Sequence, residues 1–151
     1  MFQGNGTYDV LTEENCKFCK IAKKELPASH IYEDEEVMAF LDVRPLNEGH
    51  TLVIPKKHYE TIYSVPDEEI GHLFKVARKV ACALKKSVGA EGITISQHNE
   101  RAAGQAIFHL HVHVIPRYEG QKLPRREEAL TLPEASREEL DAVARKTKMH
   151  I

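Results

Sequence analysis

The sequence predicts an α+β fold, and three observations lead to that class. One long stretch, residues 64–88, has apolar residues at helical spacing, and shorter helical patterns lie on either side of it. The chain has 151 residues, which is enough for one domain with a workable hydrophobic core. Interspersed strands and helices are typical of the α+β class. The expected strands are residues 31–33, 37–41, 51–54, 93–96 and 109–115.

The N-terminal part is expected to contain a lead-in, a short helix and a hairpin. Residues 1–13 have the composition of a flexible lead-in. The stretch from Cys16 to Lys24 has helical spacing, and Pro27 is expected to end it. The first two strands flank an acidic turn at residues 34–36, which predicts a hairpin.

The middle of the chain is expected to hold a fully buried strand and the main helix. The continuous apolar run at 51–54 fits a strand that is buried on both faces. We expect Ser64 to cap the main helix, Pro66 to lie in its first turn and Gly89 to end it. Within the helix, Cys82 is expected to be a small packed residue. The expected apolar stripe comprises Ile70, Leu73, Phe74, Ala77, Val80, Ala81, Leu84 and Val88.

After Arg117 the composition changes to glycine, proline and runs of charge, which predicts a C-terminal extension over residues 119–151. Ser136 followed by Glu139 forms a capping box, the usual start of a helix. The extension is therefore expected to contain one short helix. The apolar stripe of that helix would be Leu140, Val143 and Ala144.

The most informative stretch alternates three histidines with apolar residues just before Pro116. Successive side chains of a strand point to opposite faces, so His109, His111 and His113 would share one face. The intervening residues Leu110, Val112 and Val114 would pack into a core on the other face. Pro116 cannot donate to a strand ladder and is expected to end the strand.

A row of imidazoles allows three interpretations. The first is a pH-sensitive or merely solvated strand face. The second is a three-histidine metal site, although residues two apart on a strand are roughly 7 Å apart, so that two at most would ligate one ion. The third is nucleophilic catalysis, because a neutral imidazole is a good nucleophile near neutral pH.

The histidine stretch resembles the signature of the histidine triad (HIT) family, in which three histidines alternate with apolar residues. The similarity covers roughly residues 14–118, which defines the expected HIT-like domain. It implies an antiparallel sheet of about five strands with one long and one or two short helices, continued across a homodimer. Three further blocks match the family in the same order: Phe40-Leu41-Asp42, the run from Gly49 to His58, and Ala103-Gly104-Gln105.

The resemblance implies catalytic roles for three histidines. His111, the middle of the three, would attack the α-phosphorus of a nucleotide and form a covalent nucleotidyl-histidine, which water then hydrolyses. His113 would lie near the phosphate, where it could hydrogen-bond a phosphoryl oxygen. His50 would lie beside the nucleophile and assist proton movement.

The resemblance also implies a nucleotide site. Asp42 would accept hydrogen bonds from the ribose hydroxyls, and Gln105 would present its amide on the phosphate side. His98 stands where the family often has asparagine, and Asn99 follows it, so either one could reach the nucleotide. Ala106 stands where many relatives carry a hydroxyl. The side chains expected to sandwich the base are Phe18, Ile21, Phe40 and Val43.

Cys16 and Cys19 form a Cys-x-x-Cys pair, which from the residues alone indicates a metal site or a redox dithiol. No thioredoxin-like pattern surrounds the pair, which favours metal. In members of the HIT family that carry this pair, the other two ligands correspond to His58 and His109. The resemblance therefore implies a closed structural zinc site, with no catalytic metal or organic cofactor.

The resemblance implies a nucleotide phosphoramidate or nucleotidyl hydrolase that acts on purine nucleotides. A dinucleoside polyphosphate hydrolase is one alternative, and a catalytically weak nucleotide-binding sensor is another. The net charge of −2 argues against a nucleic-acid or membrane partner. No apolar run approaches the roughly 20 residues needed to span a bilayer, and the N-terminus lacks a signal pattern, so a cytoplasmic location is expected.

Overall fold

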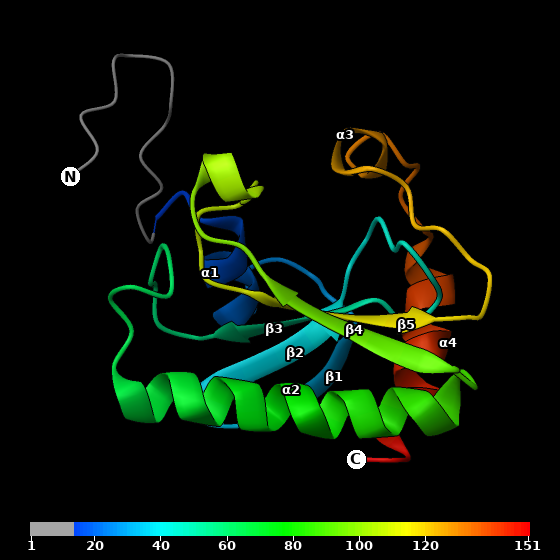
Figure 1. The fold of residues 1–151 in the computed structure, drawn as a ribbon. Coiled ribbons are helices and arrows are strands. Elements are labelled where there is room, and N and C mark those ends of the chain that lie inside the picture. The colour runs from blue at the N-terminus through cyan, green and yellow to red at the C-terminus, as the bar shows by residue number, and fades with distance from the viewer. Residues whose placement is uncertain (1–13) are drawn as a thin grey trace.

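The computed structural model describes residues 14–151, and the lead-in expected over residues 1–13 lies outside them. The chain folds into one five-stranded sheet with helices on both faces, which confirms the α+β prediction (Figure 1). All neighbouring strands are antiparallel, in the order β1-β2-β3-β5-β4. The strands are β1 (His30–Glu33), β2 (Val37–Leu41), β3 (Thr51–Pro55), β4 (Gly92–Gln97) and β5 (Val112–Arg117).

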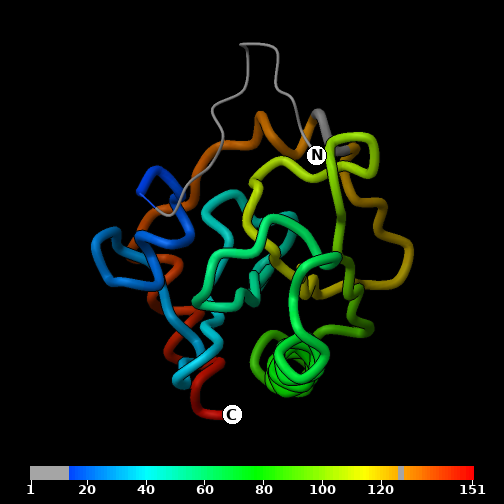
Figure 2. Tube along the Cα trace, turned by 90° about the vertical axis from the view of Figure 1, so that its left-hand side faces the viewer, coloured from blue at the N-terminus to red at the C-terminus, as the bar shows by residue number. Residues whose placement is uncertain are grey.

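The longest helix, α2 (Asp67–Ser87), lies along one face of the sheet and is seen end-on in Figure 2. It packs on the strand residues that point toward it, among them Val53, Val112 and Val114. A second cluster on the opposite face joins α1 (Lys17–Ala22) to β2 and β3 through Phe18, Phe40 and similar residues. Burial on both faces explains why β2 and β3 consist almost entirely of apolar residues.

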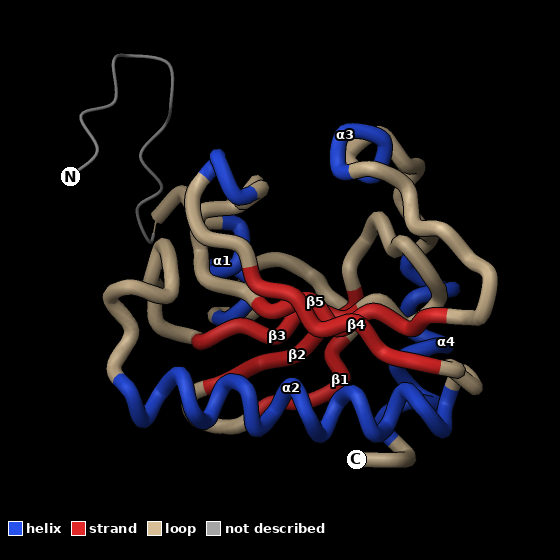
Figure 3. The backbone as a smooth tube through the Cα atoms, viewed as in Figure 1, coloured by secondary structure: helices blue, strands red, loops and turns tan. Residues whose placement is uncertain are grey.

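The C-terminal helix α4 (Arg137–Lys148) packs beside β1 and α2 (Figure 3). Ser136 caps it as predicted, because its hydroxyl accepts a hydrogen bond from the Glu139 amide at 3.1 Å. The predicted stripe of Leu140, Val143 and Ala144 is buried against Ile31 and Leu41. Two short helices were not predicted, η1 (Arg101–Ala103) and α3 (Arg126–Ala129).

The structure corrects the expected bounds of the histidine strand. Strand β5 begins at Val112, and the preceding residues are held by the loop after β3, with the Leu110 amide donating to the Tyr59 carbonyl at 2.7 Å. The strand also continues through Pro116, which pairs with Ile93 of β4. The N–H that proline lacks would point to the same side as the Pro116 carbonyl, which accepts a hydrogen bond from Asn47. On that side β3 has already ended, so no hydrogen bond between strands is lost at Pro116.

The structure also corrects three details of α2. Pro66 is the N-cap and no side chain caps the helix, so Ser64 does not have the predicted role. Gly89 does end the helix, with φ of +64°. Phe74 is 38% exposed and Cys82 is exposed rather than packed. Phe74 lies about 100° and Cys82 about 180° around the helix from Leu73, which points into the core. The face that is buried comprises Leu73, Val76, Ala77, Val80, Ala83 and Leu84.

Candidate active site and metal centre

A cavity of about 660 Å³ opens on the sheet face opposite α2. Its walls come from α1, from strands β2 to β5, from the loop between β4 and β5, and from the C-terminal extension. Leu123, Pro124, Leu130 and Glu134 of that extension lie at the cavity, and no local sequence pattern marked them. The predicted residues that line the cavity are Phe18, Ile21, Phe40, Asp42, Val43, His50, His111 and His113, together with His98.

The part of the cavity next to α1 is apolar and aromatic. Phe18 meets the ring of Phe40 edge-to-face, with 5.5 Å between the centroids. The centroid of the Phe18 ring also lies 5.3 Å from that of the His111 ring, so the apolar surface extends to the imidazoles. Helix α1 holds Phe18 in place because Phe18 and Ile21, on one side of a single turn, are both buried. This surface suits a flat aromatic group such as a nucleobase.

His111 is held in one orientation by its own backbone. Its Nδ1 lies 2.7 Å from the carbonyl oxygen of His109, and a carbonyl only accepts, so Nδ1 carries the proton and donates. The neutral ring therefore has its lone pair on Nε2. His111 is only 7% exposed and lines the cavity. A backbone carbonyl thus selects the tautomer in which the nitrogen away from the main chain is nucleophilic.

His50 is held in the opposite tautomer. The backbone amide of Leu46 donates to its Nδ1 at 3.1 Å, so the proton of the neutral ring lies on Nε2. Burial lowers the pKa of His50, and the carboxylate of Asp42 opposes that effect, so that the ring is neutral at neutral pH. Its Nε2 lies 3.0 Å from Nδ1 of His113 and 3.7 Å from Oδ2 of Asp42. His50 therefore donates to His113, whose own proton lies on Nε2.

The structure distinguishes the polar residues of the loop between β4 and β5, for which the sequence left open which side chains face the cavity. The Gln105 side chain is buried, and its amide bonds the Glu100 amide and the Glu60 and Ile107 carbonyls, at 2.7, 2.5 and 3.1 Å. Its contact with a nucleotide phosphate stays a prediction, since these bonds use the amide to shape the loop. Asn99 also lies outside the cavity lining, whereas His98 is part of it.

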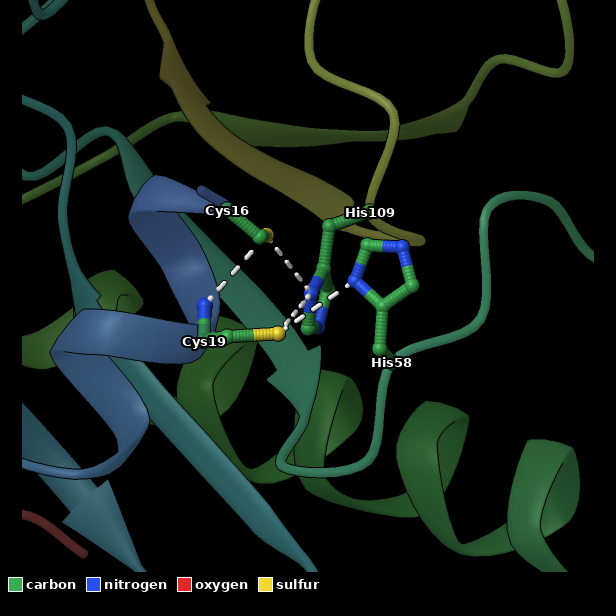
Figure 4. Close-up of side chains that lie close together, drawn as sticks. All are labelled: Cys16, Cys19, His58 and His109. Atoms are coloured by element: carbon green, nitrogen blue, oxygen red, sulfur yellow. Dashed lines mark hydrogen bonds between the residues drawn. The ribbon is translucent and has the colours of Figure 1, made fainter. Parts of the chain in front are cut away.

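Cys16, Cys19, His58 and His109 converge in a second, buried cluster (Figure 4). The two sulfurs lie at the start of α1, His58 follows β3, and His109 precedes β5. The Nδ1 of His109 is 3.3 and 3.5 Å from the sulfurs of Cys16 and Cys19, and the Nδ1 of His58 is 3.3 Å from Cys19. Zinc bond lengths place adjacent sulfur and nitrogen ligands of a tetrahedron about 3.6 Å apart, so this donor set fits zinc.

Hydrogen bonds prepare the cluster for a cation. The Nε2 of His109 donates to the Pro55 carbonyl at 2.8 Å, which leaves the lone pair of Nδ1 facing the sulfurs. Burial lowers the pKa of His109 to about 4, which keeps that lone pair available at neutral pH. The Cys19 amide donates to the Cys16 sulfur at 3.4 Å, which fixes the position of that sulfur at the start of α1. All four donor atoms lie within 4.8 Å of one another.

Asp42, His50 and His113 also lie close enough to hold a metal ion. The Leu46 amide argues against that use, because it occupies the lone pair of His50 and leaves a proton on the nitrogen that faces the cluster. We therefore assign this trio to hydrogen bonding.

None of the helices in the part of the chain that the structure describes is long and apolar enough to cross a membrane.

Comparison with known proteins agrees with this geometry. The HIT domain model matches residues 23–120. An uncharacterised HIT-like protein of Methanocaldococcus jannaschii is 46% identical over 133 residues, which cover 88% of this chain and 98% of that protein. An adenylylsulfatase of Arabidopsis thaliana is 38% identical over 117 residues, which cover 77% of this chain and 59% of that protein.

Among solved structures, a zinc-bound histidine triad protein from Mycobacterium smegmatis superposes with a TM-score of 0.73. It is 37% identical, and the match covers 91% of this chain and 99% of that one. The division at residue 118 stays a prediction, although the family model ends close to it. The matched sequence, the five-stranded fold and the arrangement of the histidines agree, and the chain belongs to the HIT domain family of nucleotide-binding and hydrolase-type proteins.

Proposed function

We propose that this chain hydrolyses nucleotide phosphoramidates or nucleotidyl anhydrides through a covalent intermediate on His111. The observation that carries the proposal is the hydrogen bond from His111 Nδ1 to the His109 carbonyl, which leaves Nε2 as the nucleophilic nitrogen in the cavity. In the first step Nε2 attacks the α-phosphorus, and the bond from phosphorus to the leaving group breaks with its electron pair. In the second step water attacks the phosphorus, and the phosphorus–Nε2 bond breaks.

The neighbouring histidines complete this proposal. The proton on Nε2 of His113 can be donated to a phosphoryl oxygen, where negative charge increases in the transition state. The amide of Leu46 and the imidazole of His50 fix that orientation without any outside group. Asp42, beside His50, would accept hydrogen bonds from the ribose hydroxyls, and the apolar surface around Phe18 would hold the base. We propose a purine nucleotide, since a larger base covers more of this surface.

We propose that Cys16, Cys19, His58 and His109 hold one zinc ion with a structural role. All four positions are taken by protein ligands, which is typical of structural zinc. When bound, the ion would supply charge that joins α1 to the segment before β5, two residues from His111. A thiol pair kept for metal is typical of a reducing compartment, in accord with a cytoplasmic location.

We also propose a homodimer, since β4 is an edge strand whose outer side pairs with no other strand of residues 14–151. Ile95 of that strand is 44% exposed and Phe74 of α2 is 38% exposed, so apolar surface accompanies the open edge. Sedimentation at micromolar concentration should give twice the chain mass of 17.1 kDa. A mass of one chain would exclude this pairing.

The experiment that tests the function is intact-protein mass spectrometry after brief reaction with an adenosine phosphoramidate. Wild type should gain a nucleotidyl mass, and His111→Ala should not and should lose at least about 100-fold in turnover. Wild type quenched at low temperature detects an adduct whose hydrolysis is fast. Near-wild-type turnover by His111→Ala would refute the covalent mechanism. Nucleotide binding without turnover would favour a nucleotide sensor instead.

A further inference from the structure

His98 is a fourth imidazole at the cavity, beside His50, His111 and His113, and the steps above do not use it. It lies in the loop after β4, half-buried, and lines the same cavity as His111 and His113. Its ring meets the ring of His113 edge-to-face, with 5.7 Å between the centroids. His113 in turn lies 5.0 Å from His111, so the ring of His113 contacts both His98 and the nucleophile.

The backbone selects the orientation of His98 as it does for His111. Its Nδ1 lies 2.9 Å from the carbonyl oxygen of Ala103, which only accepts, so Nδ1 keeps a proton and donates. This bond is compatible with both the neutral and the protonated ring. Any proton that His98 gives or takes is therefore exchanged at Nε2, and the ring need not turn to do so.

The neighbouring polar side chain cannot replace it. The oxygen of Asn99 accepts from the Ile62 amide at 2.8 Å and from Gln97 at 2.9 Å, and its nitrogen donates to the Gln97 oxygen at 2.6 Å. These bonds point Asn99 away from the cavity and fix the backbone that carries His98. The loop is thus built to present the imidazole rather than the amide.

The other groups near the reacting phosphorus already have partners or roles. His111 is the attacking group, and the Nδ1 of His113 accepts from His50. On the far side of His113 from the aromatic surface, the cavity is lined by Thr94, Ser96 and Ile115, which carry no charge. Neither hydroxyl there is acidic enough to protonate an amine at neutral pH. Arg117 also reaches this region, where it donates to Thr94 at 3.1 Å, but a guanidinium keeps its protons, so within residues 14–151 His98 is the nearby side chain that can give one to a leaving group.

We propose that His98 is a catalytic residue that protonates the leaving group, an inference that rests on the proposed function. As Nε2 of His111 bonds to phosphorus, the phosphorus–nitrogen bond of a phosphoramidate breaks and its electron pair stays on the leaving nitrogen. That nitrogen takes the proton from Nε2 of His98 and departs as a neutral amine. The neutral His98 then regains a proton from solvent, which its half-buried ring contacts.

Proton donation by His98 would give this chain a preference for substrates with an amine leaving group. An alkylamine is a very poor leaving group without a proton, whereas sulfate needs none. His98 should therefore matter for amine leaving groups and not for sulfate. The two classes can be compared through kcat/KM, which reports only steps up to the first irreversible one. Loss of the leaving group is that step, so hydrolysis of the intermediate does not enter the comparison.

The test compares wild type, His98→Asn and His72→Asn with two substrates, adenosine 5′-(N-alkyl)phosphoramidate and adenylyl sulfate. Asparagine keeps a polar side chain of similar reach but has no basic ring nitrogen. His72 is a matched control because it is a half-buried histidine on α2, bonded to Asp34 and distant from the cavity lining. Adenosine monophosphate binding and thermal unfolding of each variant monitor the nucleotide site and the fold.

We expect His98→Asn to lower kcat/KM for the alkyl phosphoramidate at least about 100-fold and that for adenylyl sulfate less than about threefold. Across a series of amines, the variant should also depend more steeply on the pKa of the leaving amine. Equal losses on both substrates, or no loss on either, would overturn the role of His98 while leaving the nucleotidyl-His111 mechanism intact. Failure of wild type to form an adduct with either substrate would overturn the mechanism itself.

Discussion

Gly49, which directly precedes His50, offers a sharp test of how the site is packed. Its φ is +94°, a conformation that costs a residue with a Cβ roughly 1–2 kcal/mol. An added Cβ would also lie 2.9 Å from Cδ2 of Leu84, 3.3 Å from Pro116 and 3.4 Å from Val88. Leu84 is fully buried and cannot move aside freely. Overpacking of this kind costs about 1–3 kcal/mol, so Gly49→Ala should lose about 2–5 kcal/mol of unfolding free energy.

Two other glycines allow the cost of backbone strain to be separated from the cost of steric overlap. Gly89 has φ of +64° and nothing within 4 Å of an added Cβ, so Gly89→Ala tests backbone strain alone and should cost about 1 kcal/mol. Gly71 lies inside α2 with open space around it, so Gly71→Ala should stabilise by about 0.5–1 kcal/mol. Equilibrium urea unfolding at constant m-value measures all three.

The ranking is the result that matters. If Gly49→Ala unfolds at the same urea concentration as Gly89→Ala, the overlap with Leu84 is not what limits this position and the packing argument is refuted. If the argument holds, kcat should fall as well, because movement of residue 49 shifts His50 relative to His113, which lies 3.0 Å away.

Three other predictions follow from particular contacts. Cys16→Ser, which removes a proposed metal ligand, should reduce the zinc content from one ion per chain and lower Tm by about 10 °C or more. The control Cys82→Ser, at an exposed cysteine, should change neither quantity. Full zinc content in Cys16→Ser would exclude the Cys16 cluster as the zinc site. Burial would raise the pKa of Asp34, but hydrogen bonds from Tyr32, the Glu36 and Val37 amides and His72 outweigh it and lower that pKa to about 2. Since the folded pKa is below the unfolded one, this stabilisation is complete above about pH 5 and is lost as pH falls toward 2; urea unfolding should show a loss on the order of 1–2 kcal/mol that Asp34→Asn lacks. Replacement of the proposed ribose acceptor in Asp42→Asn should weaken adenosine monophosphate binding about tenfold in calorimetry but leave the 2′,3′-dideoxy analogue unaffected, and equal losses for both would remove Asp42 from that role.

The local patterns of the sequence predicted the elements well, because they reflect the geometry of a single element. Alternation correctly assigned Leu110, Val112 and Val114 to the core beneath α2, since a strand has a period of two. The cap of α4 at Ser136 depends on an amide three residues away, which the sequence also contains. The Cys-x-x-Cys spacing indicated a metal site for the same reason.

The predictions that were wrong concern local sequence patterns that are compatible with more than one tertiary arrangement. A helical period shows that Phe74 and Leu84 lie within one broad arc, but only the sheet beneath decides which edge of that arc is covered, and Phe74 falls outside it. Pro116 can continue β5 only because β3 stops short on that side. The residues before the strand are diverted by a bond to the loop at Tyr59, far from them in sequence.

The sequence by itself determined the α+β class, the residue types of the site and the order of their blocks, because backbone periodicity and side-chain chemistry are local properties. Only the tertiary structure decided how those residues are used. It brought Cys16 to within 3.3 Å of His109 across 93 positions of sequence. It also brought His50 to within 3.0 Å of His113 across 63 positions of sequence, so that the tautomer of His50, set by the Leu46 amide, determines which nitrogen of His113 carries the proton. Hydrogen bonds and packing join groups by position in space, and that position exists only once the sheet has formed.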